Sequence, residues 1–363
     1  PNILKPDPFF TTTLPKLLPP SFKPSGTRNE GALGRPDNLH PFSNWSNVNT
    51  WYGLCVPALS RSTFGIYETF SPDLAIAMEE RPQEGKGVPE FWITLRKNVF
   101  WQPLNQNWFS SEIKLDPHFL KKHPVTAHDI KFYLDTMMNP HNQEAGAVAM
   151  RTFMGGLEEV RVVDDYTIVV RWKEEEVKID GETVKKIKYI AKRLTGSLKP
   201  LPRYVYQYFP DGKKIIEDDK NPDTYRKNTV WAQQMALHWA KNIIVGCGGW
   251  FFDGMSDRQI KFKRNPEHYF PLDVLITNLE IQFKDTVQSM WQSFAEGKTD
   301  LYSLPPDQLT EYEQFLKTPT YQQQKEKRLD IEKIDFLTRA YYYIGWNQVR
   351  PLFNNKKVRQ ALT

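Results

Sequence analysis

A cysteine set among glycines is the residue best placed to do chemistry in this sequence. Cys247 follows Gly246 and precedes Gly248 and Gly249, so a substrate could approach its thiol closely. A cysteine nucleophile is activated by a neighbouring base, and no histidine is placed by spacing to serve Cys247. A cysteine-dependent hydrolase is therefore one hypothesis for this segment. A tight turn that requires positive φ is the alternative explanation of the glycines.

Three histidines recur at intervals of five residues, at His118, His123 and His128, which raises the question of a metal site. The first two lie in a segment interrupted by prolines and the third lies at a predicted helix start, so solvated or capping histidines explain the spacing. The G-x-G-x-x-G, G-x-x-x-x-G-K-[ST] and G-x-S-x-G motifs are also absent. We therefore predict no catalytic residue, no metal and no cofactor.

Composition is that of a folded protein with more than one domain. The 363 residues suggest two or three domains, and 40% hydrophobic with 25% charged residues is an ordinary globular balance. The net charge of +5 is small, so nucleic acid is not an implied partner. No apolar run reaches the length of a membrane span. Because no leader precedes Pro1, we expect that any export signal has been removed.

The elements that must position these residues begin with a long Pro- and Gly-containing segment. Residues 1–40 are predicted to form an extended arm over a domain, with little regular structure. Residues 91–95 are rich in aromatic and β-branched side chains and predict a strand. Thr126 and Asp129 form a capping box that opens a helix, and Asn139-Pro140 ends it. The apolar stripe of this helix comprises Ile130, Tyr133, Leu134, Met137 and Met138.

Further along the chain, strands and helices alternate. Two hairpins are predicted, one with its turn at 164–166 and one at Asp180-Gly181 inside a solvated charge run, 173–188. The remaining predictions are a helix at 228–242, strands at 243–245, 260–263 and 279–283, a helix from 285 or 286 to Gly297, and the start of an amphipathic helix at 356–362. This mixture indicates an α/β or α+β protein with several domains.

Nine segments in the same order resemble the solute-binding proteins of oligopeptide, dipeptide and nickel ABC transporters, known as family 5. They are Leu39–Phe42 ("LNP"), Trp51–Leu54 ("YEGL"), Pro72–Ala75 ("P-LA"), Phe91–Trp101 ("TFTLRKGVKW"), Pro124–Ile130 ("PVTAEDV"), Val245–Trp250 ("VGTGPY"), Arg264–Tyr269 ("RNPDYW"), Gly297–Asp300 ("GEID") and Asn347–Ala361 ("FN…PF…VRQA"). Each segment alone is a weak match, but nine in register are not a coincidence. Residues 102–123 depart from the family pattern as an insertion, which is expected to remodel domain II.

The resemblance implies an α/β fold of the periplasmic-binding-protein type, class II, cluster C. Two lobes close over a ligand, an extra domain II lies beside them, and the C-terminal lobe is truncated. By this comparison domain I comprises 1–66 and 166–283, domain II comprises 67–165, and 284–363 begin domain III. Such proteins hold peptides through main-chain hydrogen bonds and close about a hinge.

The resemblance also names candidate ligand-binding residues. They are Asn44, Trp45, Asn47, Gly246, Cys247, Gly248, Trp250 and Asn347. Cys247, Gly249 and Trp250 stand where the family has Thr, Pro and Tyr. Trp250 could stack on a ligand or pack beneath the sheet. Because Cys55 and Cys247 fall in segments expected to line one cleft, a Cys55–Cys247 disulfide and two buried free thiols are both allowed.

The implied function is capture of short peptides outside the cytoplasmic membrane and their delivery to an ABC permease. The protein would be a monomer, peripheral to the membrane, in the periplasm or at the cell surface, with a lipid anchor as one option. A different cargo on the same fold, such as a nickel complex, haem or a saccharide, is the nearest alternative. The alternatives from other classes are a hydrolase using Cys247, and a scaffold or sensor that has kept the fold and lost transport.

Overall fold

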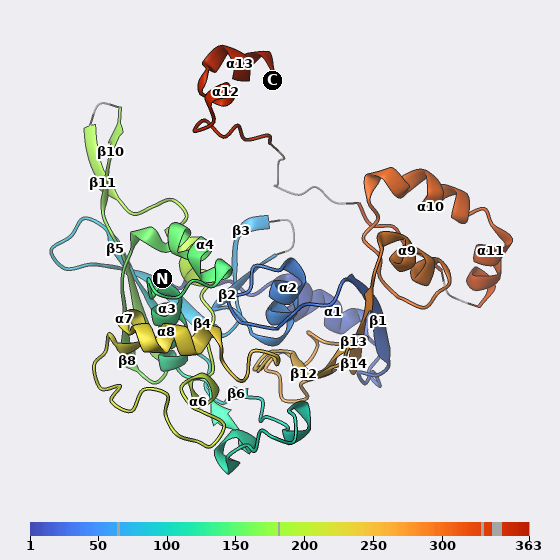
Figure 1. Cartoon of the computed structure of the whole chain (residues 1–363), viewed down its shortest axis with the longest axis horizontal. Coiled ribbons are helices and arrows are strands. Elements are labelled where there is room, and N and C mark those ends of the chain that lie inside the picture. The colour runs from blue at the N-terminus through green and yellow to red at the C-terminus, as the bar shows by residue number, and fades with distance from the viewer. Residues whose placement is uncertain (64–65, 181, 328–329, 336–342, 363) are drawn as a thin grey trace.

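Two four-stranded sheets organise the chain, and short helices cover them (Figure 1). The computed structural model describes residues 1–63, 66–180, 182–327, 330–335 and 343–362. Its strands are β1 (Thr27–Leu33), β2 (Ser60–Thr63), β3 (Ile66–Pro72), β4 (Ala75–Pro82), β5 (Pro89–Leu95), β6 (Phe100–Trp101), β7 (His123–Pro124), β8 (Leu157–Asp164), β9 (Thr167–Trp172), β10 (Glu175–Ile179), β11 (Glu182–Lys186), β12 (Trp250–Met255), β13 (Gln259–Arg264) and β14 (Asn278–Lys284).

The helices are mostly short. The α-helices are α1 (Leu14–Leu17), α2 (Ser46–Cys55), α3 (Ala127–Met138), α4 (Ala145–Phe153), α5 (Ala191–Gly196), α6 (Arg203–Tyr206), α7 (Thr224–Lys227), α8 (Thr229–Ala236), α9 (Val287–Ala295), α10 (Leu309–Phe315), α11 (Pro319–Glu326), α12 (Pro351–Asn354) and α13 (Lys356–Ala361). A π-helical turn, η1 (Phe9–Thr13), precedes α1, and 3₁₀ turns lie at η2 (Gln106–Trp108), η3 (Pro117–Leu120), η4 (Met154–Gly156) and η5 (Pro306–Gln308). Every helix in the described part of the chain is too short or too polar to cross a lipid bilayer.

The first sheet has the strand order β4–β5–β9–β8, with antiparallel neighbours throughout. Phe91, Ile93 and Leu95 alternate along β5 and are buried, which confirms the predicted strand. The hairpin β8–β9 is also confirmed, and at its turn the Tyr166 N–H donates to Asp164 Oδ1. The predicted domain boundary between residues 165 and 166 falls in this turn. It would separate β9 from the strands to which it is hydrogen-bonded.

Helix α3 begins and ends where the sequence predicts. Thr126 is its N-cap, and the capping box is present, with Asp129 Oδ2 accepting from the Thr126 N–H at 2.9 Å. The helix ends at Met138, directly before Asn139-Pro140. In the predicted apolar stripe, Ile130, Leu134 and Met137 are buried while Tyr133 and Met138 are half-buried. Local sequence therefore specified both the ends and the inner face of α3.

The second sheet has the order β1–β14–β13–β12, and β1 runs parallel to β14. Ile260, Phe262, Leu279 and Ile281 turn into the core from β13 and β14. The prediction that residues 1–40 have little regular structure is wrong for β1. The sequence Thr-Arg-Asn-Glu-Gly-Ala-Leu has no apolar alternation, so its strand conformation depends on a partner strand far along the chain.

Residues 228–245 differ from their prediction in two ways. Helix α8 ends at Ala236 rather than at residue 242, because Trp239 instead packs on Phe119 and donates its Nε1–H to the Tyr208 carbonyl. Residues 243–245 are buried but form no strand, since in the described part of the chain they are paired with no other strand. An apolar run of this length predicts burial but does not by itself supply a pairing partner.

The charged hairpin β10–β11 and helix α9 follow their predictions. All five residues of β11 are exposed, and Asp180 adopts φ 51° at the turn, while Gly181 lies outside the described residues. Helix α9 has Thr286 as N-cap and is followed by Gly297 at φ 69°. The predicted start of a helix near residue 356 is α13.

Candidate functional site

The glycine segment 246–249 is a buried turn that packs against the end of α2. The N–H groups of Cys247 and Gly248 both donate to the Cys55 carbonyl oxygen, at 2.9 and 2.8 Å. A Cβ at Gly246 would lie 2.9 Å from the Trp250 carbonyl oxygen, and one at Gly248 would lie 3.0 Å from the Cys55 carbonyl oxygen. None of these glycines has a positive φ, so the alternative prediction of a tight turn that requires positive φ is wrong. The backbone that approaches them is the chain's own.

The two thiols are buried and free. Cys55 is 0% and Cys247 is 1% exposed, and the allowed Cys55–Cys247 disulfide is not formed. Burial raises the pKa of both thiols well above the usual range, so the thiolate needed for nucleophilic attack is disfavoured. Cys247 is therefore placed as a structural residue rather than as a nucleophile.

We expect both cysteines to resist alkylation in the folded protein. At pH 8 iodoacetamide should modify them about a hundredfold or more slowly than in denaturant, because a buried neutral thiol must wait for local opening. Quantitative mass spectrometry of the Cys55 and Cys247 peptides before and after unfolding measures this. Rapid alkylation of Cys247 alone in the native protein would contradict the burial described above.

A histidine that the spacing did not indicate shares a small cavity with Cys247. His268, Tyr269, Asn265 and Cys247 line a cavity of about 30 Å³, and the His268 Nε2 lies 3.3 Å from Asp273 Oδ2. A cysteine, a histidine and a carboxylate are thus brought together by the fold. The space is sufficient for about one water molecule and not for a substrate.

The three histidines first considered as metal ligands are engaged elsewhere. His118 Nε2 contacts the Tyr204 carbonyl oxygen at 3.0 Å, and His123 Nε2 contacts the His118 carbonyl oxygen at 2.7 Å. His128 Nε2 lies 3.4 Å from Asp165 Oδ1. Among the described residues, no three His, Cys, Asp or Glu side chains converge as a metal site.

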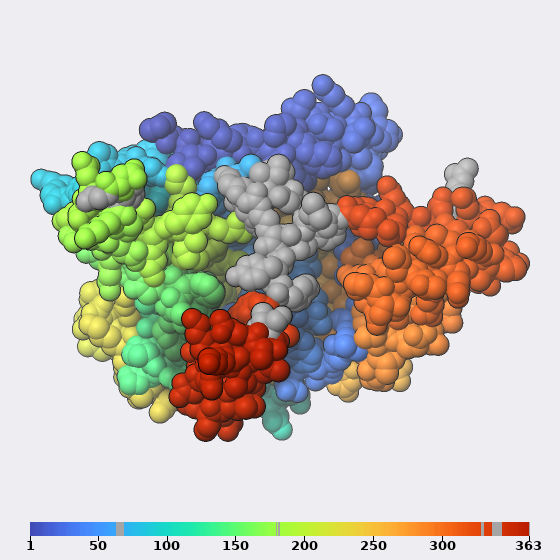
Figure 2. Space-filling model, turned by 90° about the horizontal axis from the view of Figure 1, so that it is seen from above, coloured from blue at the N-terminus to red at the C-terminus, as the bar shows by residue number. Residues whose placement is uncertain are grey.

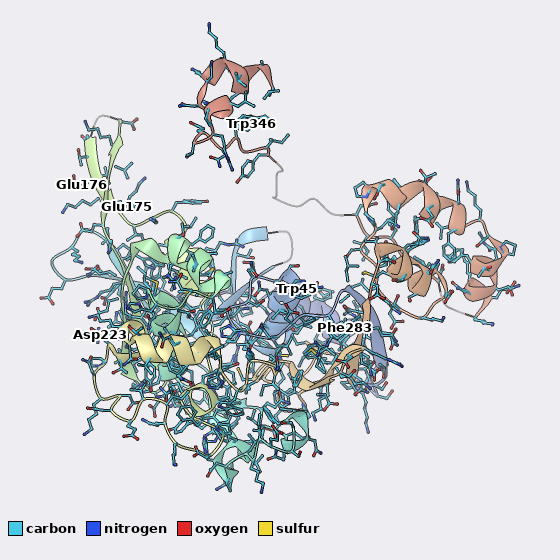
Figure 3. All side chains as sticks on the ribbon, viewed as in Figure 1. Trp45, Glu175, Glu176, Asp223, Phe283 and Trp346 are labelled. Atoms are coloured by element: carbon cyan, nitrogen blue, oxygen red, sulfur yellow. The ribbon has the colours of Figure 1, made fainter. Side chains whose placement is uncertain are left out.

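The segment before α2 places three candidate ligand residues at the opposite end of this helix. Trp45, labelled in Figure 3, is the N-cap residue of α2 and has an extended backbone. Its ring would lie 3.6 Å from a Cβ placed at Gly34. Asn44 is exposed, and Asn47 and Trp45 are half-buried. At 1.5 Å per residue, the ten residues of α2 separate Trp45 from the glycine turn by about 15 Å. The structure therefore does not bring these two groups together in one small pocket.

The remaining two candidate ligand-binding residues, Trp250 and Asn347, lie in different surroundings. Trp250 is 9% exposed at the start of β12, so it packs in the core as one of the two alternatives predicted. Asn347 is exposed in the C-terminal segment, where its Oδ1 accepts from the Val349 N–H at 3.1 Å. Beside it, Trp346 stacks on Phe353 with ring centroids 5.1 Å apart.

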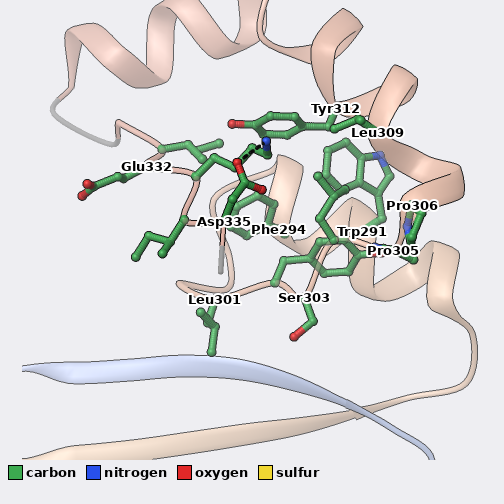
Figure 4. Close-up of a pocket in the computed structure, with 15 residues that line it drawn as sticks. Trp291, Phe294, Leu301, Ser303, Pro305, Pro306, Leu309, Tyr312, Glu332 and Asp335 are labelled. Atoms are coloured by element: carbon green, nitrogen blue, oxygen red, sulfur yellow. Dashed lines mark hydrogen bonds and ion pairs between the residues drawn. The ribbon is translucent and has the colours of Figure 1, made fainter. Parts of the chain in front are cut away.

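Two larger hollows were not found by sequence reasoning. One, of about 690 Å³, lies in the unit formed by α9 and α10 and is walled by Trp291, Phe294 and Tyr312 (Figure 4). The other, of about 870 Å³, is an open groove between the inserted residues 102–108 and residues 263–267. The signal for the cavity beside α9 was the helix predicted from residue 285 or 286 to Gly297. The predicted insertion was the signal for the second.

Two four-stranded sheets, smaller two-stranded sheets and a further helical unit make a mixed α/β architecture, which is the fold class of the two-lobed solute-binding proteins. The family description "Bacterial extracellular solute-binding proteins, family 5 Middle" matches residues 70–363. The chain therefore belongs to the bacterial extracellular solute-binding proteins of family 5. No curated protein matches the sequence.

Solved structures of ligand carriers share this fold. The chain is similar to AppA, the oligopeptide-binding protein of Bacillus subtilis solved with a nonapeptide, at TM-score 0.62 and 16% identity over 94% of this chain and 54% of that one. It is similar to HbpA2 from Haemophilus parasuis, at TM-score 0.58 and 20% identity over 93% of this chain and 56% of that one. It is also similar to DppA from Helicobacter pylori, solved with the peptide STSA, at TM-score 0.53 and 17% identity over 82% of this chain and 50% of that one. The chain spans about half the length of these proteins.

Proposed function

We propose that the protein captures short peptides outside the cytoplasmic membrane and presents them to an ABC permease. The observation that carries this proposal is the family match over residues 70–363, together with a fold shared with carriers solved in complex with peptides. Peptide carriers recognise the main chain and leave side chains in roomy pockets, which allows one site to accept many sequences.

The peptide would lie along the side of the body that carries the N-terminal end of α2. There, the Asn44 amide is exposed and can donate to and accept from a peptide backbone, and the Trp45 ring offers an apolar wall. Asn347 would approach from the C-terminal segment when the lobes close. Gly246, Cys247, Gly248 and Trp250 would act beneath this surface, because they hold the other end of α2 in place.

The hinge would lie where the chain leaves the second sheet. Strand β14 ends at Lys284, and α9 begins at Val287, so only two residues connect the sheet to the next unit. The Asp300 N–H and carboxylate hold this unit to β1 through the Asn29 carbonyl and N–H, at 2.7 and 2.6 Å. Closure about such a connection requires little change in either lobe.

Calorimetry of the full-length protein with a random library of di- to pentapeptides tests the proposal. We expect binding, and we expect Asn44→Ala to weaken it by about 3- to 10-fold, the value of one or two hydrogen bonds. Asn49→Ala is the matched control, since Asn49 is an exposed asparagine of α2, the helix that Asn44 precedes. Absence of heat with every peptide length would refute peptide capture. Equal affinity of the two variants would refute the Asn44 contact.

A further inference from the structure

A separate cavity of about 380 Å³ lies at the junction of the two sheets, beneath the N-terminal arm. Its walls include Pro6 and Phe10 from the arm, Arg61 and Pro72 from the hairpin β2–β3, Arg96 from the end of β5, and Phe270 from the loop before β14. Figure 2 shows the N-terminal residues, in blue, along one edge of the body. The volume lies within the range of small-molecule sites. Neither Trp45 nor the glycine turn belongs to it.

Two guanidinium groups face this cavity across one aromatic ring. The Arg61 guanidinium lies 4.6 Å and the Arg96 guanidinium 4.7 Å from the centroid of the Phe270 ring. Arg61 also lies 4.7 Å from the Phe10 ring, so it connects the arm to the loop. Cation–π contacts of this kind hold each side chain in place without consuming its hydrogen-bond donors.

The two arginines differ in how their charge is balanced. Arg61 Nη1 pairs with Asp273 Oδ1 at 2.7 Å, and Asp273 lines the cavity together with a second carboxyl residue, Asp7. Arg96 Nε donates to the Asp73 main-chain carbonyl at 2.6 Å. Burial lowers the pKa of Arg96, and the charge of the nearby Asp73 carboxylate partly opposes this shift. The Asp73 carboxylate accepts from the Tyr269 hydroxyl at 2.6 Å. Arg96 therefore keeps terminal N–H donors for a ligand.

We propose that this cavity binds a small organic monocarboxylate with an aromatic or aliphatic body. The carboxylate would receive charge-assisted hydrogen bonds from Arg96, in a geometry for which a guanidinium is well suited. The apolar body would lie against Pro6, Phe10 and Pro72. Because the arm supplies part of the wall, a bound ligand would fasten the arm to the junction of the sheets.

Phenylacetate is the probe for this site, and phenylacetamide, its neutral analogue of the same shape, is the matched control. We expect calorimetry or ligand-observed NMR on the full-length protein to show binding of phenylacetate. The amide should bind at least about tenfold more weakly, because it lacks the charge that Arg96 recognises. The proposal would be overturned by failure of phenylacetate to bind at about 10 mM, which is roughly the weakest affinity worth assigning to a site. Equal affinity of the acid and the amide would also overturn it.

Side-chain variants locate the site. Arg96→Gln is expected to reduce phenylacetate affinity by about tenfold or more, whereas Arg81→Gln should leave it unchanged. Arg81 is a suitable control because its guanidinium also lies over an aromatic ring, that of Trp92 at 4.4 Å, outside this cavity. An unaltered affinity in Arg96→Gln would overturn the assignment. If that variant does not fold, the acid and amide comparison on the native protein decides.

The same experiments separate this site from the proposed peptide site. Phenylacetate affinity should be the same in Asn44→Ala as in the native protein, and saturating phenylacetate should leave peptide affinity unchanged. Competition between the two would place the monocarboxylate in the peptide site and overturn the inference. Because none of the residues named for the peptide site lines this cavity, failure of peptide capture would not affect the monocarboxylate site.

Discussion

Asp129→Ala is expected to lower the free energy of unfolding by about 3–5 kcal/mol, as loss of one member of a buried charged network does. Asp129 is 3% exposed and accepts three kinds of donor: the Thr126 N–H at 2.9 Å, the Trp101 Nε1–H at 3.3 Å, and the Arg203 N–H at 3.2 Å. Truncation leaves these donors without their common partner, around a carboxylate that is itself buried. Each such buried donor costs about 1–3 kcal/mol.

Urea unfolding followed by circular dichroism measures the effect of Asp129→Ala. Asp165→Ala is the matched control, because Asp165 lies near the same helix start but has a side chain that is 69% exposed. We expect that control to change stability by less than about 0.5 kcal/mol. Asp129→Asn should fall between the two, since it retains one acceptor oxygen. Equal stabilities of Asp129→Ala and Asp165→Ala would show that the network does not hold α3.

Gly146→Ala is expected to destabilise the protein by about 1–3 kcal/mol through overpacking. Gly146 lies in α4, where helix propensity alone would make alanine more stable by about 1 kcal/mol. A Cβ at this position, however, would lie 2.4 Å from the Phe42 carbonyl oxygen and 2.8 Å from that of Ser43. These are backbone atoms, and the Phe42 carbonyl already accepts from the Gly146 N–H at 2.9 Å. The helix and the segment before Trp45 would have to move apart.

The sign of the change in the free energy of unfolding is the decisive readout for Gly146→Ala. Gly155→Ala provides the control, because a Cβ there meets nothing within 4 Å and its φ is not positive. We expect that control to be neutral or slightly stabilising. A Gly146→Ala protein as stable as the native one would mean that residues 42 and 43 yield easily. The same variant should also weaken peptide binding if Asn44 and Trp45 form the ligand surface.

Where the determinants are local, the sequence predicted the structure well. The capping box at Thr126, the proline after Asn139 and the apolar stripe between them specify α3 without reference to the rest of the chain. The turn at 164–166 and the cap at Thr286 likewise depend on a few adjacent residues. The family could also be predicted, because its motifs are short segments and their order can be read along the amino-acid sequence.

The candidate site was predicted less completely than the fold. Trp45, Asn44 and Asn47 are accessible at the start of α2, whereas Gly246, Cys247 and Gly248 are buried at its far end. A glycine signals that some backbone comes close, but it does not say whether that backbone is a ligand's or the chain's own. Here the Cys55 carbonyl is the group that comes close.

The sequence by itself determined the helices and strands that are stabilised by contacts within about a dozen residues. It also determined the family to which their motifs belong. Only the tertiary structure decided that β1 pairs in parallel with β14, that His268 lies beside Cys247, and that Arg61 and Arg96 share the Phe270 ring. Each of these contacts joins residues far apart in the chain. Such contacts form because the whole core buries its apolar surface together, so no local pattern records them.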